Sequence, residues 1–107
     1  MQPIRIVPRY RLILSYDIRA ESHDSYFRFV TNDFVPALQN MGLYMLSVWH
    51  TAYGNYPIRQ VEFVSEDLET VLDTFRSHRF KDLESRLQQY TMNYRRKLVR
   101  YQDRFQF

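Results

Sequence analysis

Few side chains in this 107-residue chain have the chemistry for catalysis. Its three histidines, His23, His50 and His78, show neither His-x-His nor His-Glu-x-x-His spacing, so we predict no metal site. The absence of cysteine excludes a thiol nucleophile. The sequence has no phosphate-binding loop and no dinucleotide-binding motif, so we predict no cofactor. Histidine is the usual base near neutral pH, which makes His50 the catalytic candidate, with Asp17 or Glu62 as the carboxylate that orients it.

Candidate ligand contacts gather in residues 47–57, "SVWHTAYGNYP", which hold the only tryptophan. Trp49, His50 and Tyr53 lie where a strand is expected to end, and strand ends often present functional groups. Ser15 and Gln60 complete the predicted set, because polar groups at buried strand positions need partners. The alternative is structural: Trp49 anchors a core or an interface, and the polar residues form a hydrogen-bonded network there.

The elements that position these residues follow from hydrophobic periodicity. Alternation predicts strands over residues 9–18, 43–51, 58–64 and about 94–106. Helical spacing predicts a helix over 25–41 that is kinked near Phe34 by Pro36 and ended by Gly42. A second helix starts after Ser65 and Asp67, and the phase of its apolar residues slips at "RSHR", residues 76–79, which predicts a joint.

The order strand–helix–strand–strand–helix–strand predicts a ferredoxin-like α+β fold, a four-stranded antiparallel sheet with its helices on one face. We expect one domain over residues 1–107, with residues 1–8 an extended N-terminal segment. Simple alternation puts Ser15, Asp17, His50, Gln60 and Glu62 on the face away from the helices. The strand over 43–51 is apolar on both faces, with Leu43, Met45 and Trp49 on one and Tyr44, Leu46 and Val48 on the other. We therefore predict a homodimer in which a second sheet covers the open face.

Composition narrows the choice of partners. The net charge of +3 is small, and although residues 94–105 are basic, we predict no nucleic-acid binding. No apolar run is long enough for a signal peptide or a membrane span, which favours a cytoplasmic protein without a membrane partner. Aromatic residues make up 17% of the chain, more than a small core needs, and this favours an aromatic-lined interface or ligand site.

Several motifs resemble the NIPSNAP-type branch of the dimeric α+β barrel superfamily. The segments "YDIR", "DFVPALQNMG" and "SVWHTAYGN" carry the matching positions, which are Tyr16, Arg19, Pro36, Gly42, Trp49, Thr51 and Gly54. The likeness spans about residues 10–90, and the turn "YGNYPIRQ" departs from it by lacking a Gly-Pro-Leu-Asn run. The resemblance implies a dimeric α+β barrel. Its superfamily includes cofactor-free monooxygenases, haem-degrading enzymes and small-molecule binders.

Three functions are consistent with this sequence. The first is a homodimer that binds, or oxidises without a cofactor, a small apolar or aromatic molecule, on the open sheet face or between sheet and helices. The second is a structural or interaction protein with no chemistry. The third is an RNA-recognition-like module, which has the same element order, but Gln60 and Glu62 stand where such a sheet presents aromatic side chains.

Overall fold

The computed structural model describes residues 7–53 and 56–101, with side chains described outside 51–58. The element order is β1 (Tyr10–Ile18), α1 (His23–Phe29), α2 (Val35–Asn40), β2 (Tyr44–Tyr53), β3 (Tyr56–Ser65), α3 (Leu68–Arg76), α4 (His78–Tyr90) and β4 (Thr91–Arg100). A 3-10 turn, Ala20–Ser22, precedes α1, and a π-helical turn, Val30–Phe34, joins α1 to α2. The expected extended segment 1–8 lies mostly outside the described residues, as does the predicted strand beyond residue 101.

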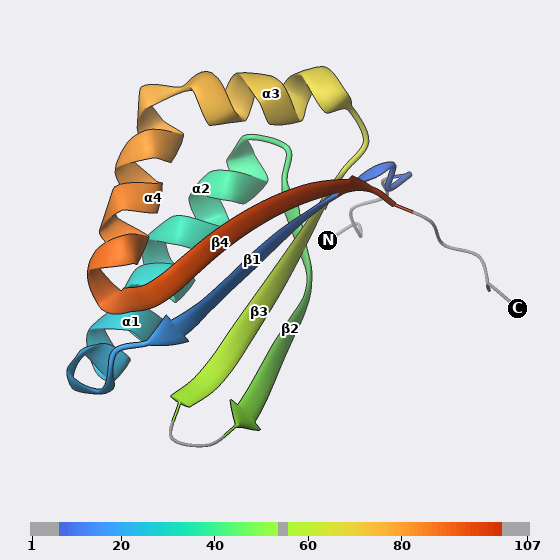
Figure 1. Ribbon diagram of the computed structural model, residues 1–107. Helices are drawn as coiled ribbons and strands as arrows, with labels where there is room; N and C mark the ends of the chain where they lie inside the picture. Colours follow the sequence, from blue (N-terminus) through green and yellow to red (C-terminus); the bar gives the residue numbers. More distant parts are fainter. Residues whose placement is uncertain (1–6, 54–55, 102–107) are drawn as a thin grey trace, which may run out of the picture.

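The four strands form one antiparallel sheet in the order β2-β3-β1-β4, and all the helices lie on one face of it (Figure 1). This arrangement confirms the predicted ferredoxin-like α+β fold. Alternate residues of β1, namely Leu12, Leu14, Tyr16 and Ile18, face the helices and are buried in the core. The residues between them face the opposite side of the sheet, which no described element covers (Figure 1). We call that side the open face.

The first helical segment is interrupted where Pro36 predicts it. Proline cannot donate a backbone hydrogen bond, and here it occupies the first turn of α2, where a missing donor costs least. The π-helical turn, in which the backbone hydrogen bonds span one more residue than in an α-helix, connects α1 to α2. Gly42 ends α2 at a φ of +94°, while the amide of Leu43 donates to Leu38 O and that of Gly42 to Gln39 O. Only glycine adopts this turn without strain.

The second helical segment is divided at Ser77, within the predicted joint. Ser77 Oγ accepts a hydrogen bond from the amide of Phe80 at 3.1 Å and so caps the first turn of α4. The break at Ser77 also explains the shift in apolar spacing. Val71 is buried in α3, and α4 begins a new helical phase in which Phe80, Leu83 and Leu87 are buried. Asp67 caps α3 by accepting from the amide of Glu69.

A β-bulge in β2 overturns the predicted assignment of faces on this strand. Met45 pairs with Phe63 and Ser47 pairs with Glu62, so β2 advances by two residues while β3 advances by one. The extra residue, Leu46, reverses the alternation beyond it. Trp49 consequently shares the open face with Tyr44 instead of sharing a face with Met45, while Val48 lies on the face of the helices, opposite Val61.

Candidate functional site

The open face brings together four side chains in one row across the sheet. Strand pairing places Trp49 opposite Gln60, Gln60 opposite Ser15, and Ser15 opposite Arg95. Directly opposed residues of an antiparallel sheet point to the same side. The row therefore runs from an indole through an amide and a hydroxyl to a guanidinium. The next row holds Ser47, Glu62, Ile13 and Lys97.

Trp49 is held by a chain of hydrogen bonds although its side chain is exposed. Its indole Nε1 donates to Ser47 Oγ at 3.2 Å, and Ser47 Oγ donates to Glu62 Oε2 at 3.3 Å. The relative exposure of Trp49 is 60%, whereas that of Glu62 is 7%. A buried carboxylate thus orients an aromatic ring that faces solvent in the single chain.

Glu62 is the centre of this polar network. Its Oε1 accepts from Gln60 Nε2 at 3.1 Å, and an Arg11 guanidinium nitrogen lies 3.7 Å from Oε2. These partners satisfy a carboxylate that burial would otherwise destabilise. The network was expected around Gln60 and Glu62, but Ser47 and Arg11 were missed. Only the bulge reveals Ser47, because it puts this residue opposite Glu62.

Two neighbouring hollows lie along β1 on the open face. One has a volume of about 430 Å³ and includes Ser15, Gln60, Arg95 and Lys97 in its lining. The other has a volume of about 270 Å³ and is lined by Ser15, Tyr16, Asp17, Asn93 and Arg95. Ser15 and Arg95 belong to both, so the hollows adjoin at the middle of the row.

Asp17 is the buried charge of the smaller hollow. Its exposure is 7%, and its Oδ2 accepts a hydrogen bond from Asn93 Nδ2 at 2.9 Å. Asn93 has a φ of +58°, the left-handed conformation that asparagine tolerates better than most residues. The β1–β4 register also shifts between Ser15 and Asp17. Asp17 Oδ1 is buried without a hydrogen-bond partner, so the site holds an unsatisfied acceptor.

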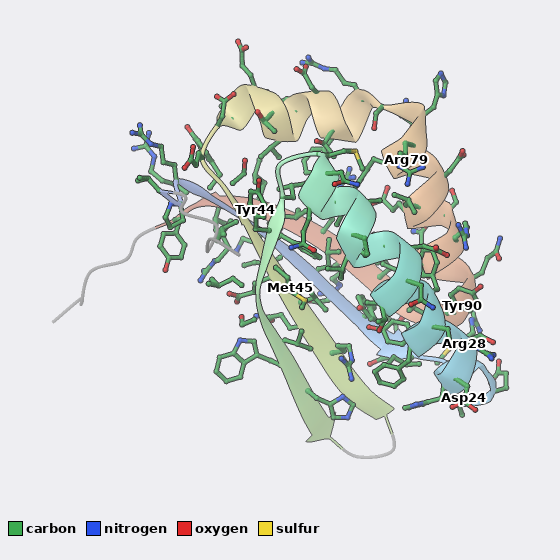
Figure 2. All side chains as sticks on the ribbon, turned by 180° about the vertical axis from the view of Figure 1, so that it is seen from behind. Asp24, Arg28, Tyr44, Met45, Arg79 and Tyr90 are labelled. Atoms are coloured by element: carbon green, nitrogen blue, oxygen red, sulfur yellow. The ribbon has the colours of Figure 1, made fainter. Side chains whose placement is uncertain are left out.

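His50 does not join this group, which corrects the predicted catalytic pairing. It pairs with Arg59, and Arg59 pairs with Tyr16, so the bulge has turned His50 to the side of the helices. Asp17 and Glu62 face the other side of the sheet, and no hydrogen bond or ion pair joins His50 to the residues described. His50 is exposed, and the β2–β3 pair to which it belongs extends past the helices (Figures 1 and 2). The predicted contact of Tyr53 lies outside the described side chains.

The space between sheet and helices is packed with aromatic side chains in the region of β1 and α1. The Tyr16 and Tyr26 hydroxyls are hydrogen-bonded to each other, and both side chains are buried. Burial, followed by the neighbouring Tyr26, raises the pKa of Tyr16. Burial also raises the pKa of Tyr26, and it raises that of Tyr94, whose hydroxyl donates to Glu84. These tyrosines stay neutral, and their rings pack in or against the hydrophobic core. Because they fill the space between sheet and helices, the open face is the better candidate site.

Two features of the described chain bear on cofactors and membranes. Residues 7–53 and 56–101 contain no group of three or more histidine and acidic side chains placed to hold a metal ion. In the same residues, no helix has both the length and the hydropathy that crossing a bilayer requires.

Comparison with known proteins gives a result at the level of structure alone. No family model matches the chain, and neither does any curated protein. A NIPSNAP family protein of unknown function from Agrobacterium tumefaciens has a similar structure, with a TM-score of 0.63 and 9% identity over 88% of each chain. A dimeric ferredoxin-like protein from an uncultured marine organism reaches 0.56 with 12% identity over 94% of each chain.

A third similar structure is a candidate antibiotic biosynthesis monooxygenase from Deinococcus radiodurans. Its TM-score is 0.68, with 6% identity over 92% of this chain and 97% of that one. Identities this low establish a shared fold and leave ligand and activity open. The resemblance to NIPSNAP-type proteins is therefore confirmed as a resemblance of fold.

Proposed function

We propose that the chain acts as a single-domain homodimer, paired through the open faces of two sheets, and binds a small apolar or aromatic molecule between them. The observation that carries this proposal is the presentation of Trp49. Its ring is held by Ser47 and, through Ser47, by Glu62, yet the residue is 60% exposed in the single chain. Binding sites require aromatic groups that are fixed in position before the partner arrives.

The exposure of Trp49 supports pairing of the sheets. Trp49 is a large hydrophobic residue that remains exposed on the open face, whereas Met45 and Val48, which are also exposed in β2, lie on the face of the helices. A domain of this size buries a limited share of its surface, so covering one sheet face with a second copy stabilises it. Glu62 and Lys97, which lie in one row of the open face on either side of Ile13, carry opposite charges, so a second copy can offer complementary charge.

Binding without chemistry is the function that this face supports best. The histidine predicted as a base is on the other side of the sheet, and the remaining carboxylates are held by Arg11, Gln60 and Asn93. A purely structural homodimer is the second candidate, because the hydrogen-bond network ties its members to one another. Cofactor-free oxidation would need a general base, and on the described part of this face the carboxylate with an oxygen free of hydrogen bonds, that of Asp17, is buried.

Sedimentation velocity on two neighbouring variants tests the dimer. Trp49→Asp places a charge on the open face, and His50→Asp places the same charge one residue away on the opposite face. We expect Trp49→Asp to sediment as a monomer at micromolar concentration while wild type and His50→Asp remain dimeric. A monomeric wild type would refute the pairing, and so would dissociation by both variants or by neither.

Isothermal titration with 2-naphthol, a compact neutral aromatic compound, tests the ligand site. We expect saturable binding to wild type and to His50→Ala, and a loss of about tenfold or more in affinity for Trp49→Ala, because stacked aromatic area is removed. A dimer that binds no 2-naphthol would support the structural candidate instead.

A further inference from the structure

We propose that the hollow between Asp17 and Arg95 binds the ammonium and carboxylate groups of a free aromatic amino acid whose ring extends toward Trp49. The proposal rests on the proposed function for its aromatic end. It adds a polar end, and with it a chemical class of ligand, from charges that the network around Glu62 does not use.

Asp17 supplies the attraction for an ammonium group. Its side chain is more than nine-tenths buried, yet only Oδ2 has a partner, the neutral amide of Asn93. None of the ion pairs among the described residues includes Asp17. A buried carboxylate without a cation is costly, and a cationic group bound in the hollow removes that cost.

Arg95 supplies the opposite charge in the same hollow. It lies in both neighbouring hollows with Ser15, and no ion pair of the described chain includes it. Asp17 and Arg95 thus line one hollow of about 270 Å³ without pairing with each other. A ligand with an anionic and a cationic group on one carbon atom can satisfy both, and an α-amino acid is the simplest such compound.

The row across the sheet sets the position of the ligand's side chain. Ser15 is separated from Trp49 by one intervening strand residue, Gln60. Two strand spacings amount to about 10 Å, which a benzyl-sized group and the indole of Trp49 can bridge together. The ring then lies over Gln60 with its edge or face against Trp49, a favourable aromatic geometry.

Three related compounds separate the two ends of the site in isothermal titration. L-phenylalanine carries both charged groups, 3-phenylpropionate lacks the ammonium, and phenethylamine lacks the carboxylate. We expect L-phenylalanine to bind wild type at least about tenfold more tightly than either analogue, because each hydrogen-bonded charge contributes about this much or more. Failure of L-phenylalanine to bind in a dimer that takes 2-naphthol would overturn this inference and leave the proposed function standing.

Variants assign each charged group to its residue. Asp17→Asn should abolish the preference for L-phenylalanine over 3-phenylpropionate, and Arg95→Gln should abolish its preference over phenethylamine. Arg100→Gln, on the same strand but outside both hollows, should behave as wild type. Equal losses in all three variants would refute the assignment. Dissociation of the dimer by Asp17→Asn, with unchanged preference among the compounds, would show that the second copy occupies Asp17 and would also overturn it.

Discussion

Gly42→Ala tests whether the turn between α2 and β2 requires glycine for two separate reasons. The φ of Gly42 is +94°, a conformation in which a side chain is strained by about 1–2 kcal/mol. A Cβ built on Gly42 would also lie 2.8 Å from Thr70 Cγ2, a distance at which one of the two atoms must move. The turn therefore couples the end of α2 to the first turns of α3.

Relief of this contact by rotation of Thr70 has its own cost. Thr70 Oγ1 donates to Asp67 Oδ2 at 3.0 Å, and a rotated side chain would break this bond for about 1 kcal/mol. The lower entropy of an unfolded chain with alanine offsets about 0.4–1 kcal/mol. Gly42→Ala should therefore lower the free energy of unfolding by about 2 kcal/mol.

Thr70→Ser separates the two contributions, because serine keeps the hydroxyl and removes Cγ2. In the Thr70→Ser background, Gly42→Ala should cost only about 1 kcal/mol, which gives a coupling energy of about 1 kcal/mol. Urea unfolding followed by circular dichroism measures all four proteins at one protein concentration, since a dimer's stability depends on concentration. A neutral Gly42→Ala would refute the argument from φ, and additive effects would refute the contact with Thr70.

Three further predictions concern the core and the helices. Ser77→Ala should lower the free energy of unfolding by about 1 kcal/mol because Phe80 N loses its cap, whereas Ser85→Ala on the exposed part of α4 should have little effect; urea titration compares them. Leu14→Ala should cost about 2–5 kcal/mol in the same assay because Leu14 is fully buried, whereas Leu68→Ala, with Leu68 37% exposed, should cost clearly less. The raised pKa values of Tyr16, Tyr26 and Tyr94 predict stability that is fully present below the unfolded pKa of about 10 and is lost as the pH rises above it, since the unfolded chain releases these protons first. The chain has nine tyrosines, so ultraviolet absorbance should show three of them ionising only as circular dichroism reports unfolding, and ionisation of all nine in the folded protein would contradict the burial of these three.

Local patterns in the sequence determine most of the fold. Strict alternation in β1 places Leu12 and Leu14 in the core, and Pro36 and Gly42 set the break and the end of the first helical segment. The break at Ser77 follows from a shift in apolar spacing and a residue suited to capping. Each of these features depends on residues close together in the chain, so each could be predicted without knowing the remainder of the structure.

The composition of the candidate site depended on tertiary structure instead. Alternation through β2 predicts His50 on the open face and Trp49 on a different face from Tyr44, and one extra residue at Leu46 reverses both. A bulge depends on how two strands pair, and the residues of one strand do not encode it. Similarly, Arg95 could be seen only as part of a basic segment until strand pairing put it beside Ser15. The sequence by itself determined which helices and strands form and which strand positions carry polar side chains. Only strand register decided that Trp49, Gln60, Ser15 and Arg95 share a row, because register is a property of the paired strands.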